Sequence, residues 1–226
     1  MGCYSADDYL QQGHDLALKR DYRSAILLFD KEIKKKTKLK EAYIQRGLCY
    51  ESINQIDSAI NDYKILVSFD PTNTTALYYI GLCKYEQKQF NEAIVYYNKA
   101  IATKGGASTS DTSRSHFILD INNDGLLGNF APFDVPSHDI FYQRGLAYYS
   151  SKQIKKAYED FQNCIQQNYY VGQSYYMVGL CWLTAGKKDK ACEAFKQGSF
   201  NGDSLATKEL NETCKWNIVA TFGAWK

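Results

Sequence analysis

The amino-acid sequence predicts an all-α fold, a right-handed solenoid of tandem helix-turn-helix repeats that ends in a capping helix. Three kinds of residue recur in register, each separated by steps of 34, 34, 64 and 34 residues. The glycines are Gly13, Gly47, Gly81, Gly145 and Gly179. The alanines are Ala25, Ala59, Ala93, Ala157 and Ala191. The aromatic residues are Phe29, Tyr63, Tyr97, Phe161 and Phe195. A 34-residue period kept by several positions at once is typical of stacked helix pairs.

The repeats are numbered so that the recurring glycine is position 8. They then cover 6–39, 40–73, 74–107, 138–171 and 172–205, and the long step leaves an insertion at 108–137. Both halves of each repeat place apolar residues at three-and-four spacing, which predicts two amphipathic helices. We expect the glycine at position 8 to face the alanine at position 20 across the pair. The aromatic residue at position 24 is expected to fill the gap toward the next repeat.

The last segment, 204–226, predicts a capping helix followed by an apolar tail. Gly202, Asp203 and Ser204 form a turn with a helix N-cap. Ala206, Leu210 and Cys214 then follow at four-residue spacing, so residues 204–216 are expected to shield the last repeat. The apolar tail is expected to fold back onto that repeat, and a homodimer would form through this end. The whole chain, 1–226, is predicted to be a single domain.

The pattern within one repeat resembles a known family. Repeat two carries it whole, with a large apolar residue, glycine, an aromatic residue, alanine, a second aromatic residue and proline at positions 4, 8, 11, 20, 24 and 32. These are Tyr43, Gly47, Tyr50, Ala59, Tyr63 and Pro71. The arrangement resembles the tetratricopeptide repeat. The resemblance implies a scaffold for protein–protein interaction rather than an enzyme, with a protein or peptide as the partner and no cofactor.

The resemblance also implies where a partner binds. In that family, contacts come from the first helix of each pair, which lines a concave groove. Carried over position by position, the groove of this chain is rich in tyrosine and leucine. The expected groove residues are Tyr78, Leu82, Tyr85, Tyr142, Leu146, Tyr149, Tyr176 and Leu180. Such a groove suits an amphipathic helix or an extended apolar segment.

Family members that hold an acidic C-terminus of a chaperone use a clamp of Lys, Asn and Arg on this face. The corresponding positions here are Leu10, His14, Gln45, Thr75 and Tyr79. The clamp positions of the next three repeats include Ile44, Leu48 and Tyr79, and they match the clamp no better. A carboxylate clamp is therefore not expected.

Composition excludes other classes. The chain has 27 basic and 25 acidic residues, a net charge of +2, which argues against an electrostatic nucleic-acid binder. No stretch of about 18 apolar residues predicts a transmembrane segment. These features favour the cytoplasm. The alternative is a lipid-anchored envelope or assembly protein, if Cys3 is the processed first residue of a lipoprotein.

The seven cysteines do not indicate a disulfide framework, because the number is odd and no CxxC pair occurs. Cys49, Cys83 and Cys181 fall at the same repeat position, two residues after the glycine. We interpret these three as reduced core thiols.

The insertion 108–137 carries the remaining chemistry. Asp120, Asn122 and Asp124, followed by Gly125, match the first half of a calcium-binding loop. Ala131 stands where the bidentate glutamate should be, so they are weak candidates. A metal-binding or enzymatic role centred on 108–137, with His116 and His138 near its ends, is a further alternative. No catalytic residue is assigned. The apolar middle of the insertion either occupies the groove or lies outside it.

Overall fold

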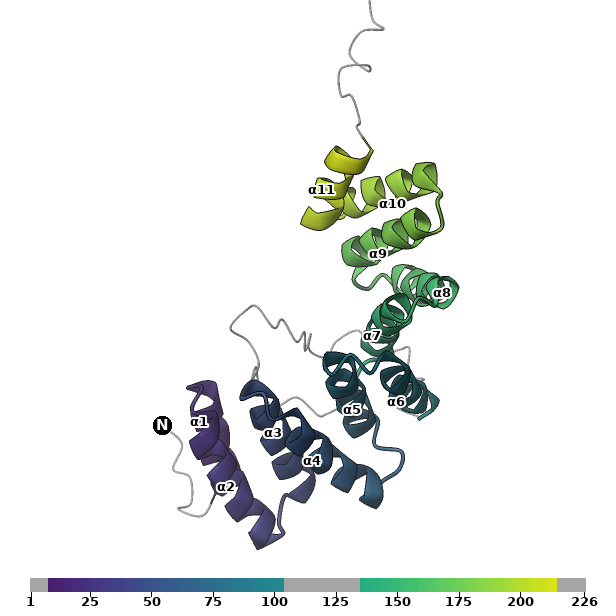
Figure 1. Cartoon of the computed structure of the whole chain (residues 1–226). Helices are drawn as coiled ribbons and strands as arrows, with labels where there is room; N and C mark the ends of the chain where they lie inside the picture. The colour runs from purple at the N-terminus through teal and green to yellow at the C-terminus, as the bar shows by residue number, and fades with distance from the viewer. Residues whose placement is uncertain (1–7, 104–134, 215–226) are drawn as a thin grey trace, which may run out of the picture. The chain divides into compact units, whose positions relative to one another are not determined.

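The computed structural model describes residues 8–103 and 135–214, and every regular element in these ranges is an α-helix. Figure 1 shows the helices in chain order. Their bounds are α1 Tyr9–Leu18, α2 Tyr22–Lys35, α3 Leu39–Ser52, α4 Ile56–Phe69, α5 Thr74–Glu86, α6 Phe90–Ala102, α7 Ser137–Ser150, α8 Ile154–Gln166, α9 Val171–Thr184, α10 Lys188–Phe200 and α11 Ser204–Thr213. The predicted all-α class and the two helices of each repeat are confirmed.

The chain divides into two compact units, residues 1–137 and 138–226. We call them unit 1 and unit 2 and describe each by itself. In unit 1, each helix from α1 to α6 packs against the next one (Figure 1). In unit 2, α8 to α11 pack in the same way, and α11 also contacts α9. A continuous right-handed stack and a single domain over 1–226 remain predictions.

The recurring glycines lie under the recurring aromatic rings. The alanines at position 20 and the aromatic residues at position 24 are all fully buried. A Cβ atom built on Gly47 would lie 2.6 Å from the ring of Tyr63, and one on Gly145 would lie 2.8 Å from Phe161. The expectation that glycine faces alanine was therefore wrong about the closest contact. The ring from the second helix occupies that space, because only glycine lets it approach the backbone so closely.

Replacing Gly47 with alanine should therefore overpack unit 1. We expect a loss of about 1–3 kcal/mol in the free energy of unfolding, since the buried Tyr63 ring must move. Urea denaturation followed by circular dichroism measures the loss. The double variant Gly47→Ala/Tyr63→Leu should lose less than the two single variants added together. Strict additivity would contradict the proposed contact.

The turn inside each repeat has one conformation. Position 15 has a positive φ in all five repeats, at Arg20, Asn54, Lys88, Lys152 and Gly186, with values between 59° and 70°. The next residue donates its N–H to the carbonyl oxygen of position 11, as Gln89 does to Lys84 at 2.9 Å. This left-handed residue ends the first helix and reverses the chain. Only the last repeat uses glycine there, although glycine adopts this conformation most readily.

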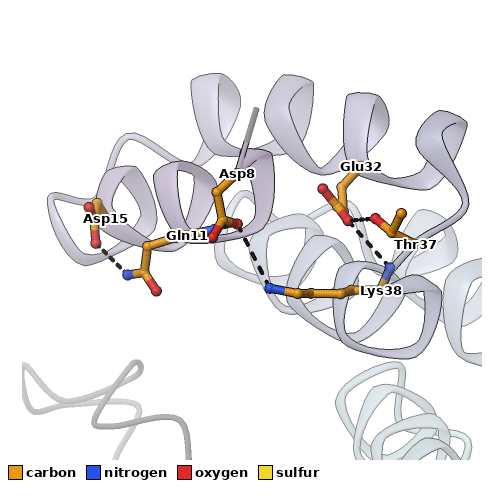
Figure 2. A network of polar contacts seen from close by, with 6 residues as sticks. All are labelled: Asp8, Gln11, Asp15, Glu32, Thr37 and Lys38. Carbon is orange, nitrogen blue, oxygen red and sulfur yellow. Dashed lines mark hydrogen bonds and ion pairs between the residues drawn. The ribbon is translucent and has the colours of Figure 1, made fainter. Parts of the chain in front are cut away.

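A buried carboxylate organises the junction between the first two repeats (Figure 2). Glu32 on α2 accepts hydrogen bonds from the Thr37 hydroxyl and, at 3.3 Å, from the backbone N–H of Lys38. Lys38 precedes α3, which has no side-chain N-cap. The ammonium of Lys38 lies 3.9 Å from the carboxylate of Asp8, and Asp8 caps α1 through the N–H of Gln11. The polar groups at the ends of three helices are thus connected.

The C-terminal cap forms as expected. Asp203 accepts a hydrogen bond from the N–H of Ala206 at 2.6 Å and so caps α11. Ala206 is fully buried, and Leu210 and Cys214 pack against the same cluster. The helix ends at Thr213 rather than at 216. The proposed apolar tail, 216–226, lies outside the described residues, and so does nearly all of the insertion 108–137.

The cysteines that the structure describes divide into two groups. Cys49, Cys83 and Cys181 are free and buried, as predicted, and so is Cys164. Cys192 and Cys214 form a disulfide with a Cα–Cα distance of 5.7 Å. The expectation from sequence missed this bond. Neither the odd number of cysteines nor the 22-residue separation identifies a pair before the fold is known.

Candidate partner-binding face

The predicted groove residues fall in both units. Tyr78, Leu82 and Tyr85 lie on α5 in unit 1. Five others lie on α7 and α9 in unit 2: Tyr142, Leu146, Tyr149, Tyr176 and Leu180. We call these five the unit 2 face. The structure describes the two groups separately, so a groove that runs through all eight residues remains a prediction.

In unit 1, most inner-face positions belong to the core. Leu10, Ile44 and Leu48 have exposed fractions of 5%, 0% and 3%. Tyr78 is also buried, and its ring centroid lies 6.1 Å from that of Tyr97. Leu82 and Tyr85 are half-buried. Of the positions named here, Leu82 and Tyr85 therefore keep part of their side chains accessible, whereas the other four are in the core.

In unit 2, all five predicted residues are half-buried. The ring of Tyr142 lies 5.7 Å from Phe161 and 4.8 Å from Tyr170, centroid to centroid. The hydroxyl of Tyr149 on α7 lies 3.4 Å from that of Thr184 on α9. These contacts restrict the rings while part of each side chain stays accessible. Such preorganised aromatic residues lose little conformational entropy when a partner binds.

A buried ion pair fixes α7, which carries three of these residues. The guanidinium of Arg144 donates to both carboxylate oxygens of Asp160 on α8, at 2.8 and 2.6 Å. It also lies 5.2 Å from the ring centroid of Phe141 and 5.6 Å from that of Tyr148. Leu146 and Tyr149 follow Arg144 on the same helix. Their positions therefore depend on a pair that the sequence analysis did not identify.

The same pair occurs in unit 1 at the same repeat positions. Arg46 on α3 donates to Asp62 on α4 at 2.8 and 2.6 Å, and its remaining nitrogen lies 2.5 Å from Asp30 on α2. Both pairs join positions 7 and 23 of a repeat. An arginine followed sixteen residues later by an aspartate was the signal available in the sequence.

The cap helix borders the unit 2 face. Tyr176, Leu180 and Leu183 on α9 pack against a buried cluster of Ala191, Phe195 and Ala206, and Leu210 and Cys214 pack against the same cluster. The first three residues come from α9, whereas Ala206, Leu210 and Cys214 belong to α11 or follow it. Part of the predicted face is thus in contact with the C-terminal cap.

Two carboxyl groups on the first helices of their repeats have raised pKa values. Burial raises the pKa of Glu51 on α3 to about 7, although the hydroxyl of Tyr63 at 2.5 Å and the thiol of Cys83 oppose the shift by hydrogen bonding to it. Burial also raises the pKa of Asp139 on α7 to about 7, opposed by a hydrogen bond with Tyr170. In the folded chain, both groups are therefore mainly protonated only below about pH 7.

This acidity should make stability depend on pH. Glu51 has an ordinary pKa of 4.5 and a folded value of about 7. Its favourable contribution is thus complete below pH 4.5 and is lost as the pH rises through 7. We expect Glu51→Gln to be more stable than the native chain by roughly 1–2 kcal/mol at pH 8 and about equal to it at pH 4.5. Thermal unfolding at both pH values tests this. The exposed variant Glu212→Gln controls for charge loss, and equal gains at both pH values would contradict the assignment.

The described residues contain no group of three or more His, Cys, Asp or Glu side chains that could hold a metal ion. The weak candidates Asp120, Asn122 and Asp124, like His116, lie outside the described ranges. His14 is buried, and burial lowers its pKa despite the nearby Asp15. Within 8–103 and 135–214, no helix is long and apolar enough to span a membrane.

Comparison with known proteins decides the family. Models of the tetratricopeptide repeat match residues 40–73, 75–103 and 138–169. This chain is a tetratricopeptide repeat protein. The matched segments are the second, third and fourth repeats of the predicted register. Proteins built from such repeats generally act as scaffolds for protein–protein interaction and are typically not enzymes.

Two yeast relatives share part of this sequence. The small glutamine-rich tetratricopeptide repeat-containing protein 2 of Saccharomyces cerevisiae is 27% identical over 111 residues, which are 49% of this chain and 32% of that protein. Heat shock protein STI1 of the same organism is 32% identical over 98 residues, 43% of this chain and 17% of that protein. The chain thus covers less than a third of either relative.

Solved structures show the same fold at low identity. MamA has a TM-score of 0.64 and 21% identity, with 95% of this chain and 100% of that chain covered. YrrB, described as a tetratricopeptide repeat protein with an unusual peptide-binding site, has a TM-score of 0.64 and 14% identity, with 90% of each chain covered. PilF of Pseudomonas aeruginosa has a TM-score of 0.66 and 15% identity, with 92% and 86% covered.

Proposed function

We propose that this protein binds an amphipathic helix or an extended apolar segment of a partner protein through the unit 2 face. One observation supports the proposal: all five residues of this face are half-buried, whereas Leu10 on α1 and Ile44 and Leu48 on α3, at matching positions, are buried. Half-buried tyrosine and leucine side chains offer apolar area without the full entropic cost of ordering.

The proposal excludes an acidic C-terminal peptide as the ligand. The clamp positions carry no Lys or Arg, and Leu10, His14, Gln45, Thr75 and Tyr79 are all buried. A carboxylate would meet no cation there. An apolar partner segment meets Tyr142, Leu146 and Tyr176 without leaving a charge unpaired.

A peptide ligand is first selected on the full chain from a display library of random helical and extended peptides. Its affinity is then measured by fluorescence anisotropy. We expect Leu146→Ala to weaken binding at least about tenfold, as is usual for a central apolar contact. Tyr85→Ala on α5 and Lys155→Ala on the exposed side of α8 are matched controls with unchanged affinity. If Tyr85→Ala abolishes binding and Leu146→Ala does not, the unit 2 face is not the site.

Neither of the two alternatives has an observation in its favour among the described residues. Cys3, the candidate lipid anchor, lies outside them, and so does the metal-binding motif of the insertion. A homodimer through the C-terminal end remains a prediction.

A further inference from the structure

One covalent bond closes the C-terminal cap. Cys192 is the fifth residue of α10, and Cys214 directly follows α11. The two helices pack against each other, and the bond joins the end of α11 to the first half of α10. Both cysteines are half-buried. A thiol reductant in solution can therefore reach the disulfide.

The other described cysteines are protected from thiol chemistry. Cys49, Cys83, Cys164 and Cys181 are free and buried. Burial raises the pKa of Cys49, Cys164 and Cys181 to about 12, and burial together with Glu51 raises the pKa of Cys83 still further. Since the thiolate is the reactive form, these four stay inert near neutral pH. A change in redox conditions acts on the Cys192–Cys214 pair alone among the described cysteines.

The two halves of α11 are held differently. The first half has the Asp203 cap, the buried Ala206 and a hydrogen bond of 2.8 Å from Thr207 to Ser199. The second half is anchored by the half-buried Leu210 and by the disulfide. A helix of ten residues is only marginally stable by itself. The second half therefore depends on the covalent bond more than the first half does.

The second half of α11 lies beside the proposed binding site. Leu210 and Cys214 share a cluster with Tyr176, Leu180 and Leu183. Burial raises the pKa of the Tyr176 hydroxyl, and the negative charge of Glu209 raises it further. Movement of residues 208–214 would thus change how much of Tyr176 and Leu180 a partner can contact.

We propose that the Cys192–Cys214 disulfide is a redox switch that sets the accessible area of the unit 2 face. This inference rests on the proposed function and adds its regulation. A dithiol reductant transfers two electrons and two protons: the S–S bond breaks, Cys192 and Cys214 become thiols, and the reductant becomes a disulfide. The second half of α11 then frays, and Tyr176 and Leu180 become more exposed.

The two states correspond to two environments. Disulfides persist in oxidising compartments and are reduced by the thiol pool of the cytosol. In an oxidising compartment the disulfide is intact and α11 stays packed. In a reducing compartment the disulfide is broken and the second half of α11 frays. The partner segment would meet a larger apolar face in the reducing environment.

Hydrogen exchange of the full chain, with and without dithiothreitol, tests the switch without any partner. We expect the exchange of the amides of residues 208–213 to accelerate at least about tenfold on reduction. The amides of α7 should be unchanged. Mass spectrometry of the same samples confirms the state of the pair.

The double variant Cys192→Ser/Cys214→Ser is the matched control. It should resemble the reduced native chain in both conditions and show no response to dithiothreitol. If residues 208–213 exchange equally fast in the oxidised and reduced native chain, the switch does not exist. That result would leave the peptide-binding test of the unit 2 face unaffected, so the two proposals fail separately.

Discussion

Replacing Asp160 with alanine is expected to destabilise unit 2 by about 3 kcal/mol, close to the loss seen when one partner of a buried ion pair is removed. The side chains of Arg144 and Asp160 are only 17% and 7% exposed, and two charge-assisted hydrogen bonds join them. Without the carboxylate, the guanidinium loses both of these hydrogen bonds to α8. Urea denaturation followed by circular dichroism measures the loss.

Unit 1 offers the control for this prediction. Asp62→Ala removes the matching carboxylate, but Asp30 remains 2.5 Å from the guanidinium of Arg46. We therefore expect a smaller loss, about 1–2 kcal/mol. The double variant Arg144→Met/Asp160→Leu should recover most of the stability that Asp160→Ala loses, since no charge is then left buried. If Asp160→Ala costs less than about 0.5 kcal/mol, the pair does not fix α7.

Reduction of the Cys192–Cys214 disulfide is expected to destabilise the end of unit 2 by about 3 kcal/mol. The bond closes a loop across 22 residues, and a loop of this length restricts the unfolded chain by about that free energy. Thermal unfolding with and without a reductant should show a lower melting temperature for the reduced chain.

The stability loss must come from this bond and no other. Cys192→Ser/Cys214→Ser should melt like the reduced native chain, and the reductant should not lower its melting temperature further. An unchanged melting temperature in the reduced native chain would show that the noncovalent contacts of α11 hold it without the disulfide.

The repeat could be predicted because its packing requires particular residue types at particular positions. Gly47 is needed where the Tyr63 ring meets the backbone, and Ala59 is fully buried. These requirements recur in each repeat, so the sequence shows a period. The order of the helices and the cap at Asp203 follow from the same kind of local signal.

The turn at position 15 could not be predicted in this way. Position 15 is basic in three repeats, asparagine in one and glycine in one, yet all five residues adopt the left-handed conformation. The hydrogen bond that closes each turn is made by backbone atoms, which leave no mark in the sequence. The stability of the surrounding helices imposes the conformation on Arg20, Lys88 and Lys152, whose side chains do not favour it.

The candidate site was predictable only in part. The family pattern assigned Leu10 and Ile44 to the inner face, and it assigned Leu146 and Tyr176 to the same face. This assignment used only the position of each residue within its repeat. Burial separates them, since the first two are in the core and the others are half-buried. The sixteen-residue spacing from arginine to aspartate was the only sign of the Arg144–Asp160 pair, and the disulfide depends on helix contacts that no sequence pattern records.

The most direct test of the account is site-specific photo-cross-linking of the selected peptide. A photoreactive phenylalanine analogue replaces Leu146 on α7 in one full-length variant and Lys155 on the exposed side of α8 in another. If the peptide binds the unit 2 face, we expect an adduct with the peptide from position 146 and none from position 155. An adduct from position 155 without one from position 146 would contradict the claim that the unit 2 face is the binding surface.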